Sequence, residues 1–308
     1  MSTDSKRSTA GNIYIDEETF HADVASIESL WQRTPIGTTR LPLIDIGRGE
    51  PVVFVPILEH LEFVYARQMR ALSQKRRVIL YRRQETRSAP IGLAERAEEL
   101  RQVLDTLEIQ QADLVGHGDA AMVLFEFALR YPRRCHSLTI IAQAADYRIA
   151  PHPFIWLLHE LYLRLPIELV LPEAALRNTV IDYIVAHDKN NDTEPALPRR
   201  LIEEQFRKIS QWPQVYKFSV LPVIHSFDVR KRVGELTMPV LLINRHDDAL
   251  APEEKTNWLA QHLPDCAGYH VIAGRERFFM YAQAETVTPL IEAFLNSRQR
   301  QRNPLRPR

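Results

Sequence analysis

Residues 106–132 read TLEIQQADLVGHGDAAMVLFEFALRYP, and they give the clearest indication of the fold. Its segment ADLVG (112–116) predicts a strand. The turn GHGDA (116–120) follows at once, and the next residues predict a helix over 120–131 that Pro132 ends. A strand that runs through a tight turn into a helix is the unit from which parallel sheets are built.

The same alternation extends on both sides of this stretch. Short runs of apolar and β-branched residues predict further strands at 41–47, 51–56, 77–81, 137–142, 239–244 and 269–273. Amphipathic segments predict helices at 16–32, 61–73, 92–107, 252–262 and 285–297. Strands that alternate with helices of this length predict an α/β fold, with a mostly parallel, doubly wound sheet covered on both faces.

One long segment interrupts the alternation. Residues 146–235 are predicted to be helical and contain repeated prolines. We therefore predict a helical cap at 146–235, inserted between two parts of one core at 38–145 and 236–297. An N-terminal extension at 1–37 and a basic, disordered tail at 298–308 complete the predicted organisation.

Composition and charge exclude several classes of partner. The 308 residues include 39 basic and 39 acidic side chains, so no net field favours a nucleic acid. The most apolar stretch, 154–171, contains His159, Glu160 and Arg164 and is too interrupted for a membrane span. There is no apolar signal segment, and two cysteines predict neither a disulfide framework nor a metal site. We expect a cytoplasmic protein without metal or cofactor, and the low net charge is compatible with a homodimer.

Four segments, in this order along the chain, resemble the α/β-hydrolase superfamily, particularly its capped epoxide-hydrolase and haloperoxidase-like branch. They are GRGEPVVFVPI (47–57), the stretch 106–132, MPVLLINRHDDALAP (238–252) and IAGRERFFM (272–280). The resemblance covers 38–297 and implies an α/β-hydrolase fold with an inserted cap. In that family the last three segments carry the serine nucleophile, the acid and the histidine base of a catalytic triad.

The family's catalytic positions hold residues that cannot perform its reaction. Gly118 stands at the nucleophile position and has no side chain to attack a carbonyl. Arg277 stands at the base position and stays protonated at physiological pH. Asp248 fits the acid position, with Asp247 as the alternative, and His117 is expected to be structural. We expect Asp248 and Arg277 to form a bidentate ion pair, and no residue is assigned a catalytic role.

Two further turns depart from the family pattern. Pro56-Ile57 replaces the histidine-glycine pair of the family's oxyanion hole, although the backbone N–H groups of Leu58 and Asp119 remain candidate donors. The glycine-containing turn after the second core strand is replaced by RRQETR (82–87). Several active-site turns have therefore changed together, whereas the strands of the scaffold have not.

These differences predict a non-hydrolytic homologue that binds a small apolar or acidic molecule under its cap, or serves as an interaction scaffold. An isomerase, cyclase or lyase in the same pocket is the alternative, and a residual hydrolase that recruits a nucleophilic water is a third hypothesis. The cap stretch 154–171 could roof a ligand cavity, or pack on the sheet or on a second subunit. The candidate ligand-binding residues are Leu58, His60, Arg82, Asp119, Trp156 and Arg277.

Overall fold

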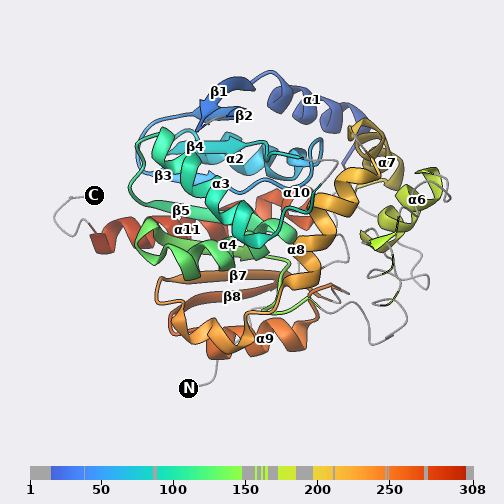
Figure 1. Ribbon diagram of the computed structural model, residues 1–308. Coiled ribbons are helices and arrows are strands. Elements are labelled where there is room, and N and C mark those ends of the chain that lie inside the picture. The colour runs from blue at the N-terminus through green and yellow to red at the C-terminus, as the bar shows by residue number, and fades with distance from the viewer. Residues whose placement is uncertain are drawn as a thin grey trace.

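An eight-stranded sheet with helices on both faces forms the centre of the molecule (Figure 1). The strand order is β1-β2-β4-β3-β5-β6-β7-β8. The structure is a computed structural model that describes residues 15–37, 39–85, 89–147, 157, 161, 164–165, 173–184, 197–210, 212–246, 248, 250–273 and 277–302. The predicted fold class, an α/β-hydrolase fold with a mostly parallel, doubly wound sheet, is confirmed.

Strands β4, β3, β5, β6, β7 and β8 are parallel to one another, and β2 pairs antiparallel with both β1 and β4 at one edge of the sheet. Every residue of β5 and β7 is buried, as expected for strands covered by helices on both faces. The strands are β1 (Gln32–Ile36), β2 (Thr39–Ile46), β3 (Pro51–Phe54), β4 (Arg77–Tyr81), β5 (Ala112–His117), β6 (Cys135–Ile141), β7 (Val240–Arg245) and β8 (Cys266–Ile272).

The position of the candidate site follows from the strand order. The chain places β3 between β4 and β5, so the winding direction of the sheet reverses there. The carboxyl ends of β3 and β5 lie side by side, because Phe54 pairs with Val115. Open α/β sheets bind ligands at such a reversal, outside the carboxyl ends of the strands.

Two groups of helices cover the sheet. Helices α3 and α4 pack together on one face, and α2 and α11 pack together on the opposite face (Figure 1). The helices of the core are α2 (Ala66–Leu72), α3 (Leu93–Thr106), α4 (Asp119–Arg130), α9 (Glu253–His262), α10 (Phe279–Ala282) and α11 (Ala284–Arg302). Helix α11 continues past the end predicted at 297, because Arg298 stacks over the ring of Phe294 at 5.4 Å and stays in helical register.

Helical elements separate β6 from β7, where the cap is predicted at 146–235. They are α6 (Glu173–Ile184), α7 (Arg199–Lys208), the π-helical turn η4 (Tyr216–Val220), α8 (Leu221–Ser226) and η5 (Arg230–Glu235). In Figure 1, α6 and α7 lie beside the sheet on the right of the view, and α8 packs against α4. The division of the chain at 146 and 235 stays a prediction.

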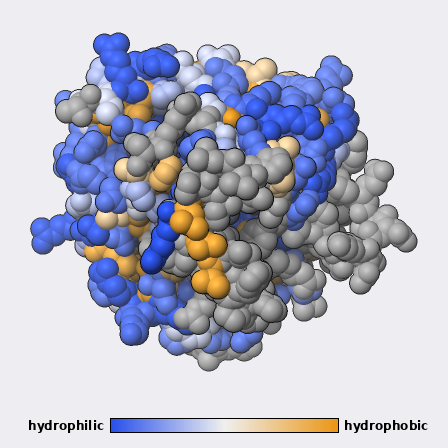
Figure 2. Space-filling view, turned by 45° about the vertical axis from the view of Figure 1, so that its right-hand side comes forward, coloured by the Kyte–Doolittle hydropathy of each residue, from blue (hydrophilic) through white to orange (hydrophobic). Residues whose placement is uncertain are grey.

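The apolar stretch 154–171 is described only in part, and Trp156 lies outside the described residues. Its described leucines, Leu157, Leu161 and Leu165, are exposed rather than turned into the molecule. Among the coloured residues in Figure 2 hydrophilic ones predominate, and a short apolar strip lies near the centre of the view. Within the described residues, no helix combines the length and the apolar composition that a membrane crossing requires.

The N-terminal region contributes to the sheet and to the core. Strand β1, which the sequence did not predict, pairs with β2 through a turn at Gly37, whose φ is +55°. Helix α1 (Glu17–Glu28) begins after Asp16, whose side chain accepts a hydrogen bond from the N–H of Thr19. It buries Phe20, whose ring packs edge-on against Phe63 and Tyr281.

A buried carboxylate fixes α1 to the core. Asp23 accepts hydrogen bonds from Arg67 at 2.9 Å, from Arg70 at 2.5 Å and from the Tyr281 hydroxyl at 3.0 Å. Burial raises the pKa of Asp23, but these three donors outweigh it and hold the pKa below its usual range. The carboxylate is therefore charged in the folded protein and ties α1 to α2 and α10.

We expect Asp23→Ala to lower the free energy of unfolding by about 1.5–3 kcal/mol, because it leaves charged donors without their acceptor. Urea denaturation of both proteins measures this difference. Asp16→Ala, which removes only an exposed helix cap, should lower the free energy of unfolding by less than Asp23→Ala does. An Asp23→Ala protein as stable as Asp16→Ala would contradict the anchoring role.

Candidate active site

The turn between β5 and α4 has the backbone geometry of a sharp elbow. Gly118 has φ +59° and ψ −122°, a conformation that favours glycine. A Cβ on Gly116 would lie 2.9 Å from the Ala121 nitrogen, so residue 116 must be glycine for α4 to start this close to β5. The turn therefore points residue 118 away from the carboxyl end of the sheet, into a pocket.

A buried carboxylate and two arginines lie beside the elbow. Arg277 donates from Nη1 to Oδ1 of Asp248 at 3.0 Å and to Oδ2 at 3.2 Å. Arg245 donates from Nε to Oδ2 of the same carboxylate at 3.1 Å. The predicted ion pair between Asp248 and Arg277 is present, but one nitrogen contacts both oxygens instead of two nitrogens in a parallel fork.

Asp248 is held in its charged form. Burial raises its pKa, but the charges of Arg277 and Arg245 outweigh that effect and lower the pKa below its usual range. The N–H groups of Leu250, at 2.8 Å, and Ala251, at 3.1 Å, also donate to Oδ1. This carboxylate is already surrounded by donors, so it balances the charge of the arginines and cannot take up a substrate proton.

The second terminal nitrogen of Arg277 lies over the elbow. A Cβ built on Gly118 would stand 3.1 Å from Nη2 of Arg277. The guanidinium therefore occupies the neighbourhood into which a side chain at residue 118 would project. A permanent cation thus faces the space where a substrate carbonyl would approach the turn.

His117 is part of the support of the elbow. Its Nε2 lies 3.0 Å from the backbone oxygen of Arg277, so this nitrogen carries the proton and donates. Burial and the charge of Arg277 lower the pKa of His117 to about 3. Its backbone N–H donates to the Tyr65 hydroxyl at 3.2 Å. The imidazole is neutral and joins the elbow to the Arg277 segment, a structural contact.

The pocket over the elbow is a cavity of about 100 Å³. Three of the residues singled out in the sequence, Leu58, Asp119 and Arg277, line it together with Gly118. The sequence did not indicate the other residues that close it, which lie between β6 and β7 in segments without a recognisable motif. They are Tyr147, Val180, Tyr216, Val220 and Ile224.

Two other candidate residues point elsewhere. Arg82 donates to Glu62 at 2.7 Å and to Glu28 at 2.6 Å, and its guanidinium stacks over the Trp31 ring. His60 lies 3.8 Å from Glu28, and burial lowers its pKa. Both belong to the contact between α1 and the core. The next residue, Arg83, instead contacts the pocket carboxylate of Asp119 at 3.0 Å.

Two backbone amides are candidate donors for a carbonyl oxygen. The backbone N–H groups of Leu58 and Asp119 belong to lining residues, and neither donates to another backbone group among the described residues. Asp119 is the one carboxylate among the described lining residues. Nowhere in the described parts of the chain do three or more His, Cys, Asp or Glu side chains gather in a way that could hold a metal ion.

Similar sequences carry the names of hydrolases. RutD of Azorhizobium caulinodans, provisionally named a carbamate hydrolase, is 26% identical over 247 residues, 75% of this chain and 86% of that protein. The poly(3-hydroxyalkanoate) depolymerase of Ectopseudomonas oleovorans is 26% identical over 208 residues, 67% of this chain and 68% of that protein. No protein-family model matches the chain.

Solved structures share the fold. An esterase from Thermogutta terrifontis superposes with a TM-score of 0.69 and 18% identity, covering 87% of this chain and 99% of the esterase. The enol-lactonase of Burkholderia xenovorans also gives a TM-score of 0.69 at 18% identity, covering 86% of this chain and 100% of the lactonase. The resemblance to the α/β-hydrolase superfamily is confirmed.

The expectation of a non-hydrolytic homologue is wrong. It rested on the residues at 118 and 277, whereas the relatives matched over two thirds or more of the chain are named as hydrolases. The expectation failed because a glycine at position 118 excludes only a side-chain nucleophile at that position. The other residues of the pocket are unaffected. Leu58, Asp119 and Arg277 still line that pocket.

Proposed function

Because the chain has the α/β-hydrolase fold, we propose that it is a hydrolase that cleaves a small carbonyl substrate in the pocket over Gly118, with water as nucleophile. The observation that carries this proposal is the position of Arg277. Its Nη2 lies 3.1 Å from the point where a Cβ on Gly118 would stand, within a pocket that apolar side chains line. A fixed cation in a water-poor pocket is suited to an oxygen that gains negative charge.

Arg277 and the backbone amides of Leu58 and Asp119 bind the carbonyl oxygen in this proposal. They polarise the carbonyl group and stabilise the tetrahedral oxyanion. Arg277 remains charged throughout because it cannot lose its proton at physiological pH. Asp248 holds the guanidinium in place through Nη1, which keeps Nη2 oriented toward the elbow.

Asp119 acts as the proton acceptor. A water oxygen forms a bond to the carbonyl carbon, and one of its protons passes to the Asp119 carboxylate. When the tetrahedral intermediate collapses, the bond to the leaving group breaks and Asp119 returns the proton to that group. Proton and charge balance at each step, and no covalent intermediate on the protein is formed.

The size of the pocket favours short substrates. At about 100 Å³ the cavity is well below the roughly 300–1,000 Å³ of typical ligand pockets, which favours a small acyl or carbamoyl group. We therefore propose short-chain esters and small carbamates as the substrate class. The carbamate half of this class is suggested by the name of the RutD relative.

The test is hydrolysis of short-chain esters and carbamates by the wild type, Asp119→Asn and Asp228→Asn. We expect turnover by the wild type and a decrease in kcat of about a hundredfold in Asp119→Asn, because an amide cannot accept the proton. Asp228→Asn changes an exposed carboxylate on the segment before η5 and should retain activity. A fluorophosphonate probe for active serines should leave the wild type unlabelled.

Two results would overturn this proposal. One is a wild type that hydrolyses none of these substrates above the uncatalysed rate. The other is fluorophosphonate labelling of a serine in the pocket, since that would restore a covalent mechanism.

A further inference from the structure

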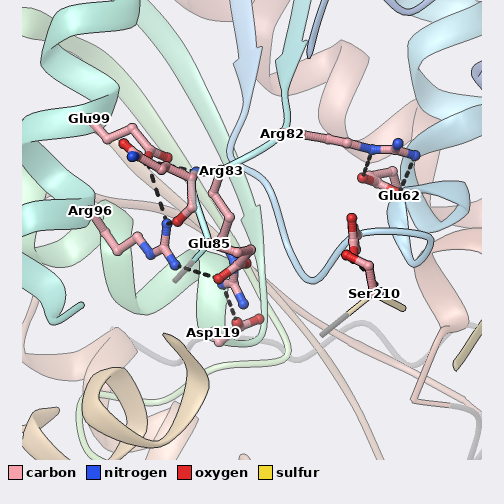
Figure 3. Close-up of polar contacts among 10 residues, drawn as sticks. Glu62, Arg82, Arg83, Glu85, Arg96, Glu99, Asp119 and Ser210 are labelled. Atoms are coloured by element: carbon pink, nitrogen blue, oxygen red, sulfur yellow. Dashed lines mark hydrogen bonds and ion pairs between the residues drawn. The ribbon is translucent and has the colours of Figure 1, made fainter. Parts of the chain in front are cut away.

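A chain of buried charges leads from the pocket into the core (Figure 3). Arg83 lies two residues past the end of β4, and its side chain is only 2% exposed. From Nη1 it donates to Oδ2 of Asp119 at 3.0 Å, and from Nε it donates to Oε1 of Glu85 at 2.5 Å. One guanidinium therefore connects the pocket carboxylate to a second carboxylate behind it.

The network of buried charges continues to α3. The second oxygen of Glu85 accepts from Nη2 of Arg96 at 3.0 Å, and Nη1 of Arg96 lies 3.5 Å from Oε2 of Glu99. Arg96 also donates to the backbone oxygen of Gln84 at 2.6 Å, and the Gln84 N–H donates to Glu99 at 2.9 Å. Figure 3 shows these side chains converging from the segment after β4, from α3 and from the start of α4.

These contacts hold the segment of residues 83–85 in place. The backbone of Gln84 is hydrogen-bonded to Arg96 and Glu99 of α3, the Arg83 side chain is bound to Asp119 and Glu85, and the Glu85 side chain is also bound to Arg96. The Arg83 guanidinium therefore has little freedom to move, and it holds the Asp119 carboxylate from one direction. Asp119 is the first residue of α4, and its side chain is 20% exposed, so burial alone does not fix its orientation.

A contribution to folding stability alone does not account for this network of buried charges. Removing two charges from water costs several kcal/mol per ion, and well-packed apolar residues often replace buried ion pairs without loss. Here the buried charges end on the one carboxylate that lines the described pocket. Charges retained in this way are expected where the orientation of one side chain matters.

We infer that Arg83 is a positioning residue that holds the Asp119 carboxylate in the orientation needed to accept a proton, with Glu85 and Arg96 fixing Arg83. This inference rests on the proposed function of Asp119. Asp119, the proton acceptor, therefore depends on Arg83, which does not contact the substrate.

The test compares Arg83→Met, Arg83→Lys and Glu85→Gln with the wild type on the short-chain ester or carbamate that it hydrolyses best. We expect Arg83→Met to lower kcat about tenfold while KM changes less than twofold, because substrate binding does not involve Arg83. Arg83→Lys keeps the cation and should recover part of kcat. Glu85→Gln, which preserves shape, should lower kcat by a smaller factor. Arg232→Met is the matched control, since Arg232 forms an exposed pair with Glu235.

The outcomes separate this inference from the proposed function. If Asp119→Asn loses activity but folded Arg83→Met and Glu85→Gln keep the wild-type kcat, the positioning role is wrong and the hydrolase proposal stands. If Arg83→Met fails to fold, Glu85→Gln decides by the same criterion. A wild type without hydrolytic activity overturns both. Variants that reduce only the yield of folded protein, with kcat unchanged, indicate a purely structural network and contradict the inference.

Discussion

We expect Asp248→Ala to lower the free energy of unfolding by about 3–5 kcal/mol, because this is the usual cost of removing one partner from a buried ion pair. Asp248 is 2% exposed, and its carboxylate accepts from Arg277, Arg245 and two backbone N–H groups. Alanine leaves two buried guanidinium groups beside each other without their counter-charge. Urea denaturation, with the midpoint and slope fitted for each protein, measures the difference.

Asp228→Ala is the matched control for this experiment. Asp228 also accepts a backbone N–H two residues further on, that of Arg230 at 3.1 Å, and pairs with the Arg230 side chain at 2.5 Å. The difference is burial, because the Asp228 side chain is 44% exposed. An exposed pair contributes about 0–1 kcal/mol, so Asp228→Ala should change stability little. Equal losses in the two variants would show that Asp248 does not hold buried charge.

The pH dependence of stability gives a second readout. The folded-state pKa of Asp248 is lowered, so its contribution is complete above the unfolded-state pKa of about 3.9 and is lost as the pH falls through the folded-state pKa. The stability difference between wild type and Asp248→Ala should therefore be constant near neutral pH. It should shrink as the pH is lowered below about 4. A difference that stays constant through that range contradicts a charged Asp248.

The sequence predicted most of the sheet because its strands are buried on both faces. Such strands are short apolar runs, as in PVVFVP (51–56) and PVLLIN (239–244), and these runs are too short for a typical helix. Strand β1, with the sequence QRTPI, was missed because an exposed edge strand needs no apolar pattern. Its existence depends on pairing with β2, which only the folded chain shows.

The sequence predicted which segments meet at the candidate site, because motifs identify these segments. It did not predict which side chains enter the pocket, because that depends on the direction in which each side chain points. The elbow, the acid segment and the Arg277 segment meet because each follows a strand with a known place in the sheet. Arg82 and Arg83 are indistinguishable by composition, but successive residues of an extended chain point to opposite sides. Arg82 therefore turns to Glu62 and α1, whereas Arg83 turns to Asp119. The alternation of the preceding strand was the available signal for this difference.

The second large effect is expected from Arg277→Lys, which should lower kcat/KM by about 10²–10³-fold, the usual cost of losing one donor to the oxyanion. Lysine keeps a positive charge beside Asp248, so the buried pair survives in part. A single ammonium group cannot both bind Asp248 and extend a second nitrogen over Gly118, as the planar guanidinium does through Nη1 and Nη2. Steady-state kinetics on the best short-chain substrate measures the change.

Arg245→Lys separates catalysis from charge balance. Arg245 pairs with the same carboxylate, at 3.1 Å, and is similarly buried, but it is not among the described residues that line the pocket. We expect it to lose stability to a similar degree as Arg277→Lys, with a decrease in kcat/KM well below a hundredfold. If the two variants lose activity equally, the arginines act only by supporting Asp248, and the oxyanion role of Arg277 is wrong. A large loss confined to Arg277→Lys supports a cation that contacts the reacting carbonyl, because both substitutions disturb the same buried carboxylate and only one removes a donor from the pocket.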